Sequence, residues 1–237
     1  FMTQPRLSLL ATNSTLVASD SRTVVTAVIS SGATLHGNTS ETATAGVVTF
    51  NNLAIRGTAG NSYVITYFSG NLISASETIT LAAGTPSKIV FHQNSSGVRV
   101  AASFDTQPIF KILDADDNVV AWDDTTTITM TASEGYLWNG ISSTPTARAQ
   151  QGIFTFSDVK WYGGAGYPFT LNYSTTGFSV PSETLTASHG VATTLTRTVR
   201  AQDAPLGNKF LTQPVYQVTD TSGNAISTFN GPITISA

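Results

Sequence analysis

Apolar and polar residues alternate along most of this chain with a period of two. The run 168–174 carries Phe, Leu and Tyr at every second position, with Thr and Asn between them. The run 24–29 repeats this pattern with Val, Ala and Ile. Strict alternation of this kind predicts β-strands with one buried face. No stretch of useful length has the 3.6-residue period of an amphipathic helix, so the pattern predicts an all-β protein.

The alternation slips by one residue at one place in each half of the chain. The step from Phe50 to Leu53 is odd, and so is the step from Phe156 to Val159. A bulge, or a bend between two sheets, would return all four side chains to the core. We therefore expect the same irregularity in both places, directly after each phenylalanine.

The two halves are copies of one another. The glycines and aromatic residues of 152–190 fall on those of 46–84 when the sequence is moved back by 106 residues. A loop between Gly140 and Gly152 is three residues longer than its counterpart in the first copy. A long period with glycines and aromatics at fixed offsets is typical of a tandem array of one domain type. The motif Phe-x-Thr-Gln-Pro marks this repeat at 1–5, 104–108 and 210–214.

The repeat predicts three modules of different completeness. Residues 85–190 form a whole module that opens with a strand at Lys88–Phe91, and residues 1–84 lack the equivalent of that strand. Residues 191–237 hold the N-terminal part of a third module, which ends inside a strand expected at Pro232–Ile235. Short strands separated by Gly, Asn and Ser turns predict sandwiches of about seven strands in roughly 100 residues.

Composition narrows the classes of function. The chain has 11 Lys and Arg, 14 Asp and Glu, a net charge of −3 and no cysteine. This charge gives no electrostatic footprint for nucleic acid or an anionic membrane. The absence of cysteine excludes disulfides and thiolate metal sites. No apolar run approaches the length of a membrane span, so we expect neither a nucleic-acid partner nor membrane insertion. Because Phe1 precedes Met2, we expect a processed product or a piece of a longer protein, and we favour the piece.

Several motifs together resemble tandem immunoglobulin-like repeats. They are Phe-x-Thr-Gln-Pro, the turns at 113–118 and 218–224, Gly-x-x-Thr-Phe, and Gly-x-Ala-Gly-x-x-Tyr/Phe. Such repeats build very large secreted microbial proteins: adhesins, surface-layer proteins, and stalk or flagellar-hair proteins. The resemblance implies tandem immunoglobulin-like β-sandwiches in an extracellular or cell-surface protein. It also implies a hydrogen-bonded corner at Tyr63, whereas Phe169 has no hydroxyl, so packing must hold the second corner.

The densest group of side-chain oxygens lies in one turn and the residues after it: Asp114, Asp116, Asp117, Asn118, Asp123 and Asp124. Calcium takes about six to eight oxygen ligands, but Asp and Asn are also common turn formers. Only Asp114 and Asn118 recur in the third copy, as Asp220 and Asn224, and the first copy has Ala11–Thr15 instead. We favour a hairpin turn and keep calcium, at Asp114, Asp116, Asp117 and Asn118, as the alternative.

Large aromatic residues are concentrated in the middle module. Trp138 and Trp161 align with apolar residues of the first copy, so we expect them in the core. Trp122 and Tyr162 align with polar residues, so we expect them to be exposed, where they could stack on a glycan. Single exposed aromatics are ordinary on protein surfaces, which is the competing interpretation.

Four Asn-x-Ser/Thr sequons are candidate glycosylation sites: Asn13, Asn38, Asn94 and Asn172. The first three lie in expected turns, and Asn172 points away from the expected core residues Leu171 and Tyr173.

No catalytic group emerges from the sequence. His36, His92 and His189 occupy different module positions and lack the spacing of metal ligands. No Gly-x-Ser-x-Gly elbow is present. We therefore predict that the protein is not an enzyme.

The sequence predicts a structural segment of a long extracellular repeat protein, such as a filament, stalk or surface appendage. Its partners would be copies of itself or neighbouring repeats. The alternative is an adhesin whose middle module binds a glycan or a host protein. Since the first module lacks its opening strand, strand donation between chain ends is a further expectation. The donated residues would be Val191, Leu195 and Val199.

Overall fold

A computed structural model describes residues 3–234, and its described part consists of strands and loops without a helix. The all-β fold class is thus confirmed. In the described residues no helix is long and apolar enough to cross a membrane. The chain is divided into two structural units. Unit 1 comprises Phe1–Pro86 with Leu113–Val120, and unit 2 comprises Ser87–Ile112 with Ala121–Ala237.

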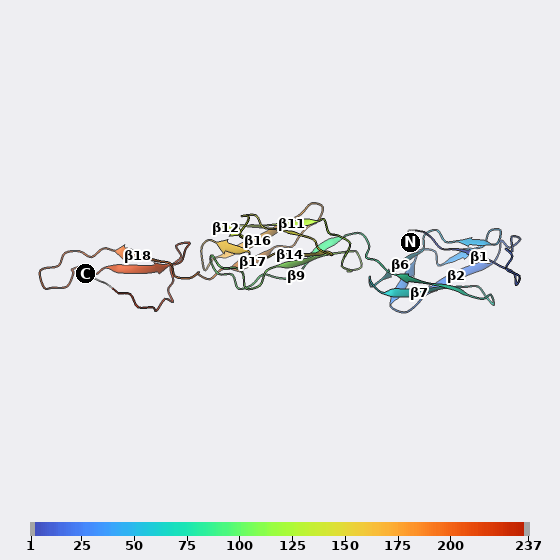
Figure 1. The fold of residues 1–237 in the computed structure, drawn as a ribbon, viewed down its shortest axis with the longest axis horizontal. Coiled ribbons are helices and arrows are strands. Elements are labelled where there is room, and N and C mark those ends of the chain that lie inside the picture. Colours follow the sequence, from blue (N-terminus) through green and yellow to red (C-terminus); the bar gives the residue numbers. More distant parts are fainter. Residues whose placement is uncertain (1–2, 235–237) are drawn as a thin grey trace. The chain divides into compact units, whose positions relative to one another are not determined.

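Unit 1 is an immunoglobulin-like β-sandwich (Figure 1). One layer is a four-stranded sheet in the order β4-β2-β7-β8, and the other holds the pairs β1-β5 and β3-β6. The strands are β1 (Arg6–Ser8), β2 (Val24–Ile29), β3 (Ala33–His36), β4 (Ser40–Thr42), β5 (Val47–Thr49), β6 (Ala54–Gly57), β7 (Ser62–Phe68) and β8 (Ala75–Thr80). Alternate residues of β2 and β7, among them Val25 and Ile65, pack against Val48, Phe50 and Leu53.

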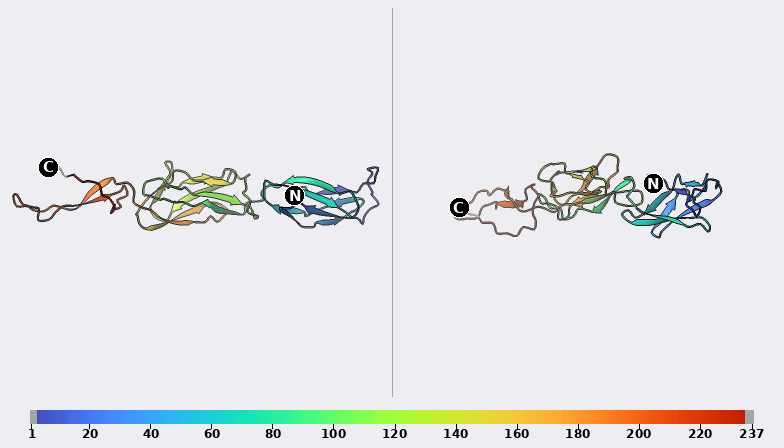
Figure 2. Two further views of the ribbon diagram at one scale, coloured as in Figure 1. Left: turned by 90° about the horizontal axis from the view of Figure 1, so that it is seen from below. Right: turned by 45° about the vertical axis from the view of Figure 1, so that its right-hand side comes forward.

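Unit 2 contains a sandwich of the same plan, β9 to β17, which has one strand more than that of unit 1, and a ribbon of this kind is visible in its part of the chain (Figure 2). Its four-stranded sheet runs β13-β11-β16-β17, a three-stranded sheet runs β14-β10-β9, and β12 pairs with β15. The strands are β9 (Lys88–Gln93), β10 (Ile109–Leu113), β11 (Thr127–Ala132), β12 (Tyr136–Trp138), β13 (Thr146–Arg148), β14 (Ile153–Thr155), β15 (Lys160–Tyr162), β16 (Pro168–Ser174) and β17 (Glu183–Thr186). The strand expected at Lys88–Phe91 is therefore confirmed as β9. A hairpin of β18 (Thr194–Val199) and β19 (Val215–Thr219) follows.

The recurring glutamine of Phe-x-Thr-Gln-Pro bridges the break in the alternation. In the first copy the break separates β5 from β6, with Phe50 and Leu53 fully buried on either side. The side-chain amide of Gln4 donates to the Leu53 carbonyl (3.1 Å) and accepts from its N–H (3.0 Å). Gln107 makes both bonds to Val159, each 3.2 Å long. The expected irregularity is confirmed in both copies, and the glutamine supplies hydrogen bonds that the interrupted ladder leaves open.

The two corners are held in the two ways that the resemblance implied. The Tyr63 hydroxyl accepts from the Thr58 N–H at 3.0 Å and donates to the Thr58 carbonyl at 3.3 Å. Phe169 stacks on Trp161, with ring centroids 4.3 Å apart and an interplanar angle of 11°. A hydrogen bond in one copy is thus replaced by an aromatic contact in the other. Trp161 is buried, as expected.

The expectation that Trp138 lies in the core is wrong. β3 places Leu35 opposite Ile55, whereas β12 places Leu137 opposite Trp161. Leu137 is therefore the structural equivalent of Leu35, one position earlier than the sequence alignment suggested. A shift of one residue in a strand moves a side chain to the other face of the sheet, and Trp138 is 39% exposed.

The strand expected at Pro232–Ile235 does not form in its described part, residues 232–234, and Ile235 lies outside the described residues. Its equivalent in unit 2 is β11, which pairs with β13 and β16. Within residues 191–234 the described strands are β18 and β19, and neither is the equivalent of β13 or β16, so residues 232–234 join no ladder there.

Candidate functional site

The turn Asp114–Asn118 follows β10 and is built around one carboxylate. The Asp114 N–H donates to the Asn118 carbonyl at 2.9 Å and closes the turn. Asp114 Oδ1 accepts from the backbone N–H groups of Asp116 and Asn118, both at 2.9 Å. Asp114 is buried, 4% exposed. This is the hairpin turn that the sequence favoured.

Both side chains of the turn also hold segments far away in the sequence of unit 1. Asp114 Oδ2 accepts from the N–H of Gly84 at 2.8 Å. Asn118 Nδ2 donates to the Gly57 carbonyl at 3.1 Å, and Asn118 Oδ1 accepts from the Ala59 N–H at 2.9 Å. We call these five residues the clasp: Asp114, Asn118, Gly84, Gly57 and Ala59.

The clasp is made a second time, 106 residues later, inside unit 2. Asp220 Oδ2 accepts from the Gly190 N–H at 2.9 Å. Asn224 Nδ2 donates to the Gly163 carbonyl at 2.9 Å, and Asn224 Oδ1 accepts from the Ala165 N–H at 2.8 Å. All five residue types and all three long-range bonds are the same. The Asp and Asn that recur in the sequence therefore make the same long-range hydrogen bonds in both places.

The first copy of the turn shows that its backbone does not need these side chains. The Ala11 N–H donates to the Thr15 carbonyl at 2.9 Å, as in the other two copies, although Ala and Thr stand where the later copies have Asp and Asn. Since the turn forms without them, turn formation alone does not account for Asp114 and Asn118. Their long-range bonds to Gly84, Gly57 and Ala59 do.

Hydrogen bonding sets the charge state of both acids. Burial raises the pKa of the Asp114 carboxyl, but the N–H groups of Gly84 and Asn118 lower it by more, so the net shift is downward. Burial and the N–H groups of Gly190 and Asn224 act on Asp220 in the same way, again with a lowered pKa. Both carboxylates are therefore charged acceptors at neutral pH.

These lowered pKa values predict a loss of stability in acid. A carboxyl whose pKa is lower in the folded state stabilises the fold fully above its unfolded pKa, about 3.9, and this contribution is lost as the pH falls through the folded pKa. Thermal unfolding followed below pH 4 should show this loss. In an Asp114→Asn, Asp220→Asn variant, which cannot titrate there, the melting temperature should depend less steeply on pH. An equal dependence in both proteins would contradict the prediction.

The calcium hypothesis remains a prediction. Within residues 3–234 no group of three or more His, Cys, Asp or Glu side chains is arranged to hold a metal. Asp123, at the edge of the same acidic stretch, accepts from the N–H groups of Thr125 and Thr126 before β11. Asp20 makes the equivalent bonds to Arg22 and Thr23 before β2. Asp123 thus belongs to a separate turn, which recurs at Asp20 in the first copy.

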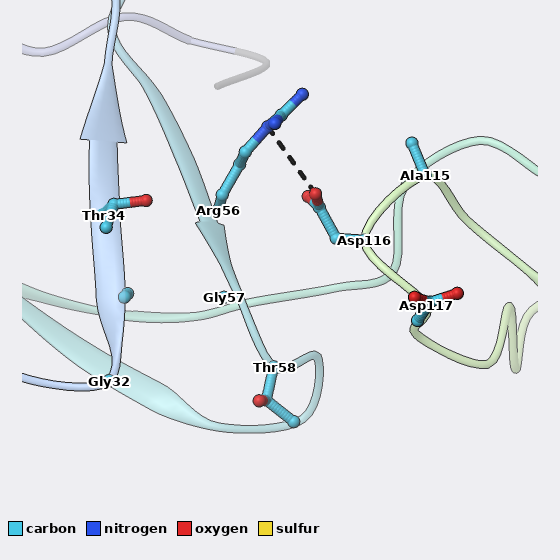
Figure 3. Close-up of a pocket in the computed structure, with 9 residues that line it drawn as sticks. Gly32, Thr34, Arg56, Gly57, Thr58, Ala115, Asp116 and Asp117 are labelled. Atoms are coloured by element: carbon cyan, nitrogen blue, oxygen red, sulfur yellow. Dashed lines mark ion pairs between the residues drawn. The ribbon is translucent and has the colours of Figure 1, made fainter.

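A polar hollow of about 600 Å³ lies beside the first clasp (Figure 3). Arg56 Nε lies 3.6 Å from Asp116 Oδ1 across it, with the side chains 60% and 35% exposed. The second clasp has Tyr162 and Ser222 at these positions, so the ion pair is not repeated. Exposed pairs of this kind contribute little, about 0–1 kcal/mol.

The structure does not bring Trp122 and Tyr162 together. Trp122 precedes β11 and is 58% exposed, whereas Tyr162 pairs with Tyr136, which follows β11. Trp122 and Tyr162 thus lie at opposite ends of β11, a strand of six residues that is roughly 20 Å long. Tyr162 instead stacks on Tyr136, with centroids 4.8 Å apart and an interplanar angle of 1°. Trp138 lies two residues after Tyr136, on the same outward face of β12.

The remaining candidate residues are on the surface. The four sequon residues are all exposed, and Asn172 points away from buried Leu171 and Tyr173 as expected: Asn13, Asn38, Asn94 and Asn172. Val191, Leu195 and Val199 are 81%, 45% and 37% exposed. β18, which carries the last two, is paired antiparallel with β19, so its donation would have to break that pairing. Glycosylation and donation by β18 remain predictions.

Comparisons with known proteins find only distant likenesses, all among solved structures. No family model and no curated protein matches the chain. The bacterial integrin-binding protein invasin is similar over 97% of this chain and 45% of its own, with 14% identity and a TM-score of 0.40. The S-layer protein rSbsC(31-844) is similar over 90% of this chain and 25% of its own, with 13% identity and a TM-score of 0.29. For a β-glycosidase from Bacteroides vulgatus the values are 70%, 21%, 14% and 0.31. This chain spans less than half the length of each of these structures.

Proposed function

We propose that the chain is a structural segment of an extracellular repeat protein that forms a filament, stalk or surface appendage. The observation that carries the proposal is the recurring clasp. The same five residue types make the same three long-range hydrogen bonds in each of two places, 106 residues apart. Each clasp joins the turn of one sequence repeat to the corner and final glycine of the repeat before it.

The recurring buried polar groups of the clasp serve attachment. Asp114 and Asp220 are 4% and 2% exposed, and their oxygens accept N–H groups. A buried carboxylate is costly unless it is paired or hydrogen-bonded, and here both are used to hold one repeat to the previous one. A tandem array built this way transmits load along the chain, which suits a spacer or filament.

Labelling of source cells tests this proposal. An antibody raised against residues 1–237 is expected to bind intact cells, and external protease is expected to remove the epitope. An antibody against a cytoplasmic protein is the control and should bind only after permeabilisation. If the epitope also appears only after permeabilisation, the proposal is wrong.

The second candidate function is that of an adhesin, and the aromatic face of β12 and β15 favours it. Tyr136, Trp138 and Tyr162 lie on one outward face, where flat rings suit stacking on sugars or on a partner protein. A glycan array probed with the whole chain and with a Tyr136→Ala, Tyr162→Ala variant tests the glycan branch. Glycan binding that the double substitution abolishes supports this function. If neither protein binds any glycan, the glycan hypothesis is wrong.

A further inference from the structure

The outward face of the four-stranded sheet of unit 1, β4-β2-β7-β8, carries no charge. Alternate residues of β2 and β7 are buried, among them Ala27 and Ile65, so the residues between them point outward. The strand registers place outward residues of β4 and β8 beside these. The residues that point outward from the four strands are Val, Phe, Ser and Thr only. This face, all of it within the described residues, therefore has no Lys, Arg, Asp or Glu.

Four apolar side chains lie next to one another at the centre of this face. They are all between 41% and 48% exposed: Val24, Val28, Val64 and Phe68. The register of β2 with β7 puts Phe68 diagonal to both Val24 and Val28, and it puts Val64 diagonal to Val28. Diagonal neighbours on one face of a sheet are about 7–8 Å apart, which is within reach of an aromatic side chain. We call these four residues the apolar patch.

The equivalent face of unit 2 shows that the fold does not require apolar residues there. The matching registers of the two sheets place a hydroxyl-bearing residue at each of the same four positions: Thr127, Thr131, Thr170 and Ser174. An antiparallel sheet with one solvated face ordinarily has polar residues on that face, as unit 2 has. Exposed apolar residues that lie together mark a surface for a partner, so the apolar patch of unit 1 is an interaction surface.

The hydroxyls around the apolar patch are bonded to one another. Thr26 Oγ1 lies 2.9 Å from Ser40 Oγ, and Ser62 Oγ lies 2.8 Å from Thr80 Oγ1. Removing water costs less for a polar group that already has a hydrogen-bond partner. The face can therefore be covered by a surface that supplies no hydrogen bonds of its own.

We propose that this face binds the same face of a second copy of the chain, sheet against sheet. A charged partner would leave its charges unpaired against an uncharged face, at a large cost. The same face of another copy brings no charge, and a two-fold axis makes one surface its own partner. The inference goes beyond the proposed function, because the clasp joins repeats within one chain, whereas this contact joins two chains.

The size of the face sets the strength of the contact. Four strands about 4.8 Å apart and about 20 Å long cover about 400 Å² on each copy. This area is about half of the roughly 800 Å² that each partner buries in a stable interface of standard size. Two single chains are therefore expected to associate weakly and reversibly. Chains that carry several such faces would bind more tightly, because linked contacts reinforce one another.

Sedimentation equilibrium of the whole 237-residue chain tests the proposal. The chain is expected to form a reversible dimer as its concentration approaches the millimolar range. A fourfold variant gives the apolar patch the residues of unit 2: Val24→Thr, Val28→Thr, Val64→Thr and Phe68→Ser. Since unit 2 has the same sheet with these residues, the variant should fold. Its dimer is expected to be at least about tenfold weaker, which corresponds to about 1.4 kcal/mol.

Two further comparisons separate this face from other surfaces. Thr66→Lys places a charge at the centre of the face and should abolish the dimer, whereas Asn172→Lys changes the equivalent position of unit 2 and should leave the dimer unchanged. A double variant, Leu72→Thr and Ile73→Thr, removes exposed apolar side chains from the loop between β7 and β8. The dimer of this variant should be as strong as that of the unaltered chain.

Three results would overturn the inference. One is a chain that stays monomeric up to millimolar concentration, which would assign the face to a partner other than this chain. Another is equal association of the fourfold variant or of the Thr66→Lys variant. The third is a dimer that the loop variant or Asn172→Lys weakens as much as Thr66→Lys does. Circular dichroism of each variant confirms that it is folded. Failure here leaves the cell-surface experiment standing, since that experiment does not involve this face.

Discussion

Replacing Glu183 by alanine is expected to lower the free energy of unfolding of unit 2 by about 3–5 kcal/mol. Glu183 accepts hydrogen bonds from Ser95 and Tyr173, both of which are buried. Its removal would leave a buried N–H and two buried hydroxyls without their acceptor. Native-state hydrogen exchange of the amides of β16 and β9 measures the change, because it reports each unit of a multi-domain chain separately.

Unit 1 provides the matched control for this change. Glu77→Ala alters the equivalent position, but Glu77 is exposed and accepts from Tyr67. Water can replace the lost partner there, so the expected cost is about 1 kcal/mol or less. Equal losses in the two variants would show that the carboxylate acts through the tyrosine alone and that the β9 segment adds nothing.

The repeat and the strands could be predicted from the sequence because both depend on local patterns. Alternation identified the strand that became β16, and the 106-residue interval between Glu77 and Glu183 identified equivalent positions. The irregularity after Phe50 could also be predicted, since few backbone structures other than a bulge or a bend accommodate one odd step in a period of two. The role of Gln4 could not, because its partner Leu53 lies 49 residues away.

Only half of the candidate site could be predicted from the sequence, because its other half depends on contacts between residues far apart in the chain. The turn at Asp114 was expected from residue types, and its recurrence at Asp220 from the repeat. The acceptor role of each acid depends on a glycine 30 residues earlier in the chain, Gly84 or Gly190. Nothing in the residue pattern specifies that contact. The first copy, with Ala11 and Thr15, was the available signal, since a turn that forms without Asp and Asn indicates another use for them.

The position of Trp138 shows where alignment of copies fails. The shift between the copies is 103 residues at the start of the repeat and 106 at its end, and the sequence alone places the difference in one loop. The strand pairing of β12 shows a further one-residue change before Tyr136. In a strand, one residue decides between core and surface. The aromatic face formed by Tyr136, Trp138 and Tyr162 was missed through this single step.

Replacing Asp114 by alanine is expected to open the first clasp while leaving the turn itself folded. The turn at Ala11–Thr15 closes without an acid, so the backbone at Leu113–Val119 should persist. Gly84 and Asn118 would lose a charged acceptor, at a cost of about 2–3 kcal/mol. Faster hydrogen exchange at Gly84 and Ala59, with little change at the amides of the turn, is the expected pattern.

A variant in the same turn separates the clasp from the general effect of removing negative charge. Asp116→Ala removes the exposed partner of Arg56, and its expected cost is at most about 1 kcal/mol. Exchange at Gly84 should not change in this variant. If Asp114→Ala instead unfolds the turn and leaves Gly84 protected, Asp114 is only a turn former. The recurrence at Asp220 would then reflect local geometry, and the main support for an array that transmits load would be lost.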